Sequence, residues 1–161
     1  HFINLETNLI EANVLVGVRP RVALFTPDGN QVWVSAEIGG TISVIDVASH
    51  RIVEEIAFQI PGIERAAIQP VGLSITADGK RVFVALGPAA RIAVVDAETY
   101  QVEKYLLVGQ RVWNLALTPD ERYLVSTNGV SNDVSIIDAD RLKVLKSIKV
   151  GRLPWGVVIK P

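Results

Sequence analysis

Arginine and tryptophan gather at two positions that recur along the chain. At the internal spacing described below, one position holds Arg19, Gln69, Arg111 and Leu153; the position two residues on holds Arg21, Val71, Trp113 and Trp155, with Arg152 beside them. Guanidinium groups are planar, always-charged donors that suit carboxylate or phosphate, and indole adds a large amphipathic face. The set is therefore a candidate site for an acidic ligand. The alternative is structural, with the tryptophans packed between repeat units and the arginines paired with aspartates of nearby turns.

Residues for catalysis or metal binding are scarce. The chain has two histidines, His1 and His50, and neither cysteine nor methionine, so no His-based catalytic triad, metal triad or usual haem or copper ligand set can be built. No phosphate-binding glycine motif occurs. Residues 128–133 offer oxygens to calcium but lack the spaced carboxylates of a dedicated loop, which favours a plain turn. We expect no catalytic residue, no metal site and no cofactor in these 161 residues.

The carboxylates follow a repeat. Asp28, Asp78 and Asp120 are separated by steps of 50 and 42 residues, and the aspartates at 46, 96 and 138 are separated by the same two steps. A fixed period of ~40–50 residues in two independent landmarks indicates a repeat architecture. Because the aspartates recur in turn-like contexts, capping of turns explains them better than acid–base chemistry.

One repeat unit contains four strand-like segments. They cover residues 22–25, 31–35, 41–45 and 51–56, with turn residues at 26–30 and a hairpin signal at Gly39-Gly40. The fourth segment is charged, as a solvated edge strand is. Four strands in a unit of this length predict an all-β fold, namely a β-propeller of four-stranded antiparallel blades.

The phase of the repeat divides the chain into parts of a propeller. Residues 1–16 are the end of one blade, 17–57 a blade, 58–108 a blade with an insertion at 58–70, 109–150 a blade, and 151–161 the inner strand of a closing blade. This is about half of a ring, since propellers usually have ~4–8 blades. Two possibilities are open: a longer polypeptide supplies the remaining blades, or a second copy pairs with this half-ring.

The segment before each inner strand crosses one face of a propeller and reaches the mouth of its central channel. The Arg and Trp positions lie there, and the insertion lies on the same crossing. Glu64 and Arg65 in the insertion could contact a partner, or the insertion is an ordinary surface loop. The candidate ligand- or partner-binding residues at the channel mouth are Arg19, Arg21, Glu64, Arg65, Arg111, Trp113, Arg152 and Trp155.

The composition of the chain argues against nucleic acid and membrane as binding partners. Sixteen Lys plus Arg and seventeen Asp plus Glu give a net charge of −1, which lacks the positive field that nucleic-acid binding normally needs. No apolar run approaches the ~18 residues of a membrane span. We expect a protein partner or a small acidic ligand, and neither nucleic acid nor membrane insertion.

Several motifs resemble a known family. Thr-Pro-Asp-Gly after the first strand, residues 123–128 and residues 131–138 resemble the YVTN-type β-propeller repeat over nearly the whole chain. Residues 83–89, 105–113 and 153–158 are more narrowly similar to β-propeller proteins associated with pyrroloquinoline-quinone (PQQ)-dependent alcohol catabolism. The resemblance implies a periplasmic, seven-bladed, non-catalytic protein of roughly twice this length that acts beside quinoprotein dehydrogenases. Leu86-Gly87-Pro88 departs from the pattern, as does the length.

Two function classes follow. The first is a non-enzymatic interaction scaffold that supports a PQQ-dependent alcohol oxidation system, with a quinoprotein dehydrogenase as a possible partner. The second is the propeller subunit of a quinoprotein or amine-dehydrogenase-like redox enzyme, in which another subunit brings the cofactor.

Overall fold

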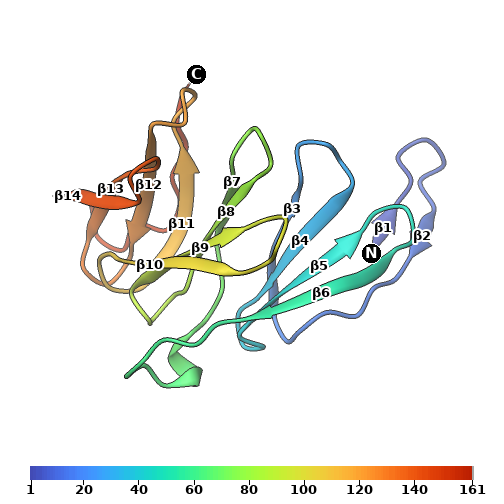
Figure 1. Cartoon of the computed structure of the whole chain (residues 1–161), viewed down its shortest axis with the longest axis horizontal. Helices are drawn as coiled ribbons and strands as arrows, with labels where there is room; N and C mark the ends of the chain where they lie inside the picture. Colours follow the sequence, from blue (N-terminus) through green and yellow to red (C-terminus); the bar gives the residue numbers. More distant parts are fainter. Residues whose placement is uncertain (161) are drawn as a thin grey trace.

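The computed structural model describes residues 1–160. Three four-stranded antiparallel sheets follow a two-stranded one, and within that range the only helical element is the short 3-10 turn η1 (Arg65–Ala67). The sheets stand side by side along an arc, each as one blade (Figure 1). The predicted all-β class and four-stranded propeller blades are confirmed.

Each blade uses its strands in chain order, so every neighbouring pair is an antiparallel hairpin. The N-terminal hairpin has β1 (Phe2–Ile3) and β2 (Ile10–Ala12); the first complete blade has β3 (Pro20–Phe25), β4 (Gln31–Ala36), β5 (Thr41–Asp46) and β6 (Arg51–Ala57); the second has β7 (Leu73–Ile75), β8 (Arg81–Ala85), β9 (Arg91–Asp96) and β10 (Val102–Leu107); the third has β11 (Val112–Leu117), β12 (Tyr123–Asn128), β13 (Asp133–Asp138) and β14 (Lys143–Lys149).

The central strands of the first and second complete blades bury both of their faces, because each of these two blades lies between two neighbours. In β4, Trp33 packs toward the second complete blade, whereas Val32 and Val34 pack toward the N-terminal hairpin. In β8, Val82 belongs to the cluster shared with the first complete blade and Phe83 to the cluster shared with the third. The period of two in a strand thus places alternate apolar residues in two inter-blade cores.

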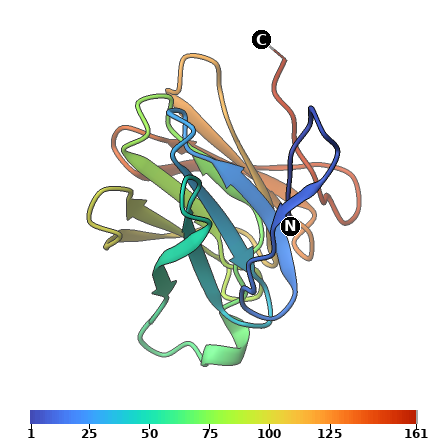
Figure 2. The same ribbon diagram turned by 90° about the vertical axis from the view of Figure 1, so that its right-hand side faces the viewer.

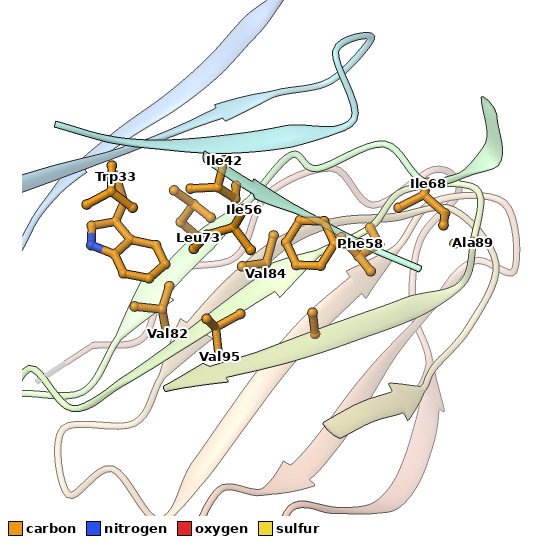
Figure 3. Packing of buried hydrophobic residues seen from close by; sticks show 13 residues of the cluster. Trp33, Ile42, Ile56, Phe58, Ile68, Leu73, Val82, Val84, Ala89 and Val95 are labelled. Carbon is orange, nitrogen blue, oxygen red and sulfur yellow. The ribbon is translucent and has the colours of Figure 1, made fainter. Parts of the chain in front are cut away.

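The largest core lies between the first and second complete blades (Figure 3). Trp33, Ile42 and Ile56 face Leu73, Val84 and Val95 across the gap, and Phe58 and Ile68 join them from the two ends of the insertion. Phe58 is 4% exposed. The insertion is therefore fastened to the core at both ends.

The insertion projects from the end of the blades that also carries the β4–β5 hairpin, opposite the β3–β4 and β7–β8 hairpins (Figures 1 and 2). Gln59 N donates a 3.3 Å hydrogen bond to the Tyr105 hydroxyl, and burial raises the pKa of that tyrosine. Residues Glu64 and Arg65 at its tip are exposed.

Residues 151–160 form no strand, in contrast to the inner strand predicted over 151–161; Pro161 lies outside the described residues. A strand needs a paired neighbour, and none pairs with these residues in the described structure. The segment nevertheless lies against the third complete blade: Thr127 Oγ1 donates a 3.1 Å hydrogen bond to Trp155 O. Its repeat counterpart is the 2.7 Å bond from Ser35 Oγ to Val71 O at the next inner segment.

The repeated aspartates cap turns, as predicted. Thr26 Oγ1 donates a 2.6 Å hydrogen bond to Asp28 Oδ1, and that oxygen also accepts one from Asn30 N at 3.0 Å. The same threonine bond recurs at Asp78 and Asp120. In all three, the threonine hydrogen bond is the largest cause that lowers the aspartate pKa from its usual value.

His50 directly precedes β6. It sits in a left-handed turn with φ 53° and is half-buried, with its ring centroid 4.6 Å from that of Phe2. The histidine therefore helps to pack the N-terminal hairpin.

Candidate functional site

Five of the predicted residues come together at one end of the inner strands. We call them, with two residues that contact them, the Arg–Trp cluster: Arg19, Arg21, Glu37, Gln69, Arg111, Trp113 and Trp155. They come from the starts of β3 and β11, from the β4–β5 hairpin, from the end of the insertion and from the C-terminal segment. In Figure 1 the starts of β3 and β11 and the β4–β5 hairpin lie at the insertion end of the blades.

The Glu37 carboxylate is the centre of the cluster. Its side chain is 2% exposed, and its Oε2 lies 2.6 Å from Arg21 Nε and 3.2 Å from Arg19 Nε. Arg111 Nη2 donates a 3.1 Å hydrogen bond to Oε1. Oε2 accepts no hydrogen bond of regular geometry from residues 1–160, so the contacts of Arg19 and Arg21 are ion pairs. A buried carboxylate requires such charged partners to offset the loss of its hydration.

Arg111 connects residues of three blades. Besides its bond to Glu37 in the first complete blade, its Nη1 donates a 3.2 Å hydrogen bond to Gln69 Oε1, at the entry to the second. Arg111 itself directly precedes β11 in the third. The cluster therefore stabilises the arrangement of the blades as well as offering a surface.

Trp113 forms the apolar wall of the cluster. The Cζ atoms of Arg111 and Arg21 lie 4.4 and 5.7 Å from its ring centroid, within the range of cation–π contacts. The Trp155 centroid is 6.5 Å away at an interplanar angle of 60°. Gly129 makes room for the indole, because a Cβ there would lie 2.7 Å from Trp113 Nε1.

Two arginines of the cluster have left-handed backbone conformations. The φ angles are 62° at Arg19 and 58° at Arg111, and Leu153 at the same repeat position has 51°. The turns are held by hydrogen bonds from Glu37 N to Arg19 O and from Gly129 N to Arg111 O. Because Leu153 has the same conformation, the left-handed turn is a feature of the repeat and does not depend on arginine.

The structure therefore sorts the predicted residues into two groups. Arg19, Arg21, Arg111, Trp113 and Trp155 are connected through the contacts above, whereas Arg152, Glu64 and Arg65 are exposed and make no contact with the cluster among those found in residues 1–160. Arg65 instead borders a separate, half-open hollow of about 590 Å³, which is also lined by Phe58 and Ile68 of the insertion.

The arginines do not pair with the turn aspartates, which was the structural alternative. They pair with Glu37, which is not among the candidate residues that the sequence indicates. The repeat alignment does contain a feature that distinguishes Glu37. It lies nine residues before Asp46, and the residues at the same position before Asp96 and Asp138 are glycines, Gly87 and Gly129. Glu37 faces Arg19 across the β3–β4 pair, where Glu37 N donates a hydrogen bond to Arg19 O. A carboxylate in place of glycine at this position, opposite an arginine, indicates an ion pair.

The chemistry open to the cluster is binding of anions. Three guanidiniums surround one carboxylate, and no other ion pair found in the described part of the chain uses these arginines. No group of three or more His, Cys, Asp or Glu residues within 1–160 is placed to hold a metal ion. No helix of the described structure has the length and apolar character of a membrane span.

Comparison with known proteins defines the class of the fold. No protein-family model and no curated protein matches the chain. Solved structures do match. Hydrazine synthase from Kuenenia stuttgartiensis matches 92% of this chain and 40% of its own, with a TM-score of 0.74 at 21% identity. The WD40 repeats of RRP9 match 83% of this chain and 39% of their own, with a TM-score of 0.72 at 18% identity.

U3-55K gives a similar result, with a TM-score of 0.71 at 17% identity over 83% of this chain and 40% of its own. The chain thus spans about two fifths of the length of these structures. At such low identity the likeness concerns the fold alone, and that fold is a β-propeller.

Proposed function

We propose that the protein is a non-catalytic, periplasmic interaction scaffold of a PQQ-dependent alcohol oxidation system, and that it binds an acidic partner or ligand through the Arg–Trp cluster. The observation that supports binding is the surplus of cationic groups around Glu37, beside Trp113 and the exposed Trp155. Arginine and tryptophan are enriched where protein interfaces gain most of their free energy. The periplasm and the quinoprotein partner rest on the resemblance of residues 83–89, 105–113 and 153–158 to that family.

The proposed scaffold is completed either by further blades or by a second copy. The inter-blade cores show why completion matters, because each further neighbour adds buried apolar contacts to the face of a blade. In the third complete blade, Leu115, Leu124 and Ile137 pack against the second blade. The opposite face of this sheet has no further blade beside it in the described residues.

A binding measurement tests the proposal directly. A purified quinoprotein alcohol dehydrogenase is immobilised, and the protein is passed over it in 50 mM salt, as wild type and as the Arg111→Ala/Trp113→Ala double variant. We expect the double variant to bind at least about tenfold more weakly, a loss of about 1.4 kcal/mol. The matched control is Glu64→Ala/Arg65→Ala, which changes two exposed residues outside the cluster and leaves binding unchanged.

The proposal fails if wild-type protein does not bind the dehydrogenase. The site assignment fails if the double variant lowers the melting temperature while its folded fraction binds as wild type does. In that case the arginine and tryptophan have a structural role only.

The second candidate function is a propeller subunit of a redox enzyme. One of the structures with a similar fold belongs to an enzyme, hydrazine synthase, so the fold is compatible with this function. The visible absorption spectrum of the intact native protein separates the two functions. A bound quinone or haem band contradicts the scaffold and supports the enzyme subunit.

A further inference from the structure

The charges of the Arg–Trp cluster do not balance. Arg19, Arg21 and Arg111 contribute three positive charges, and Glu37 neutralises one of them. No further carboxylate pairs with these three side chains within residues 1–160. Two of the three positive charges therefore have no carboxylate partner within residues 1–160.

The three arginine side chains are more exposed than the carboxylate that they contact. The Glu37 side chain is 2% exposed, whereas those of Arg19, Arg21 and Arg111 are 54%, 28% and 27% exposed. The carboxylate therefore occupies the inner side of the arginines, and an incoming ligand meets guanidinium groups on the outer side. Each guanidinium carries five N–H donors, and the contacts with Glu37 and Gln69 use only a part of them.

The arginines are held before any ligand arrives. Glu37 pairs with all three, Gln69 accepts a hydrogen bond from Arg111, and the Trp113 ring lies within cation–π range of Arg21 and Arg111. Less side-chain entropy is then lost on binding, because the donors are already placed. Bidentate pairs between arginine and carboxylate gain both energy and orientation from such placement.

We infer that the cluster is a site for a small dicarboxylate, and that Glu37 sets the charge of the ligand by neutralising one of three arginines. The inference rests on the binding role proposed above and adds the class of ligand. A dianion cancels the remaining two charges, a monoanion leaves one uncompensated, and a trianion gains no third counter-charge.

Calorimetric titration tests this charge preference in low salt, where screening is weak. The probes are succinate, its monoamide succinamate, which has nearly the same size and one charge fewer, and the tricarboxylate tricarballylate. For wild-type protein we expect succinate to bind about tenfold more tightly than succinamate, the equivalent of about 1.4 kcal/mol, and tricarballylate to bind within about twofold of succinate. Equal binding of succinate and succinamate, or binding of neither, overturns the inference.

Two variants change the charge balance in opposite directions. Glu37→Gln leaves three charges, so tricarballylate should bind about tenfold more tightly than succinate; Arg19→Gln leaves one, so the advantage of succinate over succinamate should vanish. Arg19 is the most exposed of the three arginines, which makes its replacement the milder change for folding. Circular dichroism verifies that each variant is folded. An unchanged preference in the folded Arg19→Gln variant contradicts the inference.

The failure of this inference is distinct from the failure of the proposed function. Loss of the dicarboxylate preference with intact binding to the dehydrogenase refutes only the ligand class. Loss of binding to the dehydrogenase with an intact dicarboxylate preference refutes the proposed partner and leaves the ligand site.

Discussion

Arg111 Nη2 donates a 3.1 Å hydrogen bond to Glu37 Oε1, across 74 residues of sequence and from the third complete blade to the first. The bond crosses the entry to the second blade, where Gln69 accepts the other hydrogen bond of the same guanidinium. The Arg111 side chain thus connects three blades and is also part of the positively charged surface of the Arg–Trp cluster. We therefore expect changes at this contact to affect both stability and the proposed binding.

Replacement of Glu37 should destabilise the protein. Glu37→Gln removes the charge that three arginines contact, and hydrogen bonds to charged groups contribute about 1.5–3 kcal/mol. Because the arginines can turn toward water, we expect the free energy of unfolding to fall by about 1–2 kcal/mol. The matched control is Glu103→Gln, which breaks the more exposed 3.0 Å pair with Arg81 and should cost less than about 1 kcal/mol. Urea denaturation measures both; equal effects would show that Glu37 is not the centre of the cluster.

A methyl group at Gly129 should displace Trp113. The Cβ of Gly129→Ala would lie 2.7 Å from the indole Nε1, so the ring must move and its contacts with Arg111 and Arg21 change. We expect a shift in tryptophan emission and a loss of about 1–3 kcal/mol in the free energy of unfolding. Gly151→Ala is the control, since nothing lies within 4 Å of a Cβ there. Identical emission spectra for wild type and Gly129→Ala would contradict the position of Trp113.

Acid should destabilise the fold through the Thr–Asp turns. The pKa values of Asp28, Asp78 and Asp120 are lowered below 3.8, mainly by threonine hydrogen bonds. Their contribution to stability is therefore complete above the unfolded-state pKa and is lost as the pH falls through the lower folded-state values. The triple variant with valine at the three threonines keeps the carboxylates and loses the largest cause of the shift. Denaturation midpoints from pH 7 to pH 2 should fall less steeply for the variant than for wild type, and parallel curves would disprove the role of the turns.

The root and the tip of the insertion should respond differently to substitution. Phe58 is 4% exposed in the largest inter-blade core, so Phe58→Ala should cost about 3–5 kcal/mol. Glu64→Ala/Arg65→Ala changes two exposed side chains and should alter the free energy of unfolding by less than about 0.5 kcal/mol. Thermal denaturation of the two variants compares them. A tip variant as destabilised as Phe58→Ala would mean that the insertion is held by its tip.

The sequence predicts the repeat parts of the molecule well, because each strand has the same pattern in several copies. The turn aspartates and the β4–β5 hairpin depend on contacts between residues that are close in sequence, so they can be predicted without knowledge of the tertiary structure. The inner strand predicted over 151–161 does not form in the described residues, since a strand depends on a neighbour as well as on its own residues.

The candidate site is predicted only in part. The repeat alignment groups Arg19 with Arg111 and Trp113 with Trp155, but it contains no information on which acid neutralises the arginines. Glu37 reaches Arg111 only through the stacking of three blades. The insertion that carries Glu64 and Arg65 projects from the end of the blades where the cluster lies (Figure 1), but neither side chain is among those found in contact with the cluster in residues 1–160. A shared end of the molecule does not specify a distance between residues.

The most direct test of the binding site is a ¹H–¹⁵N spectrum of the tryptophan indole and arginine Nε–H groups during a titration with succinate. The indole signal of Trp113 and the Nε–H signals of Arg21 and Arg111 should shift along one saturating curve, whereas the indole of Trp33, buried between two blades, should stay in place. Shifts of equal size at Trp33, or no saturating shift at Trp113 and the arginines, would contradict the assignment of the Arg–Trp cluster as a binding site.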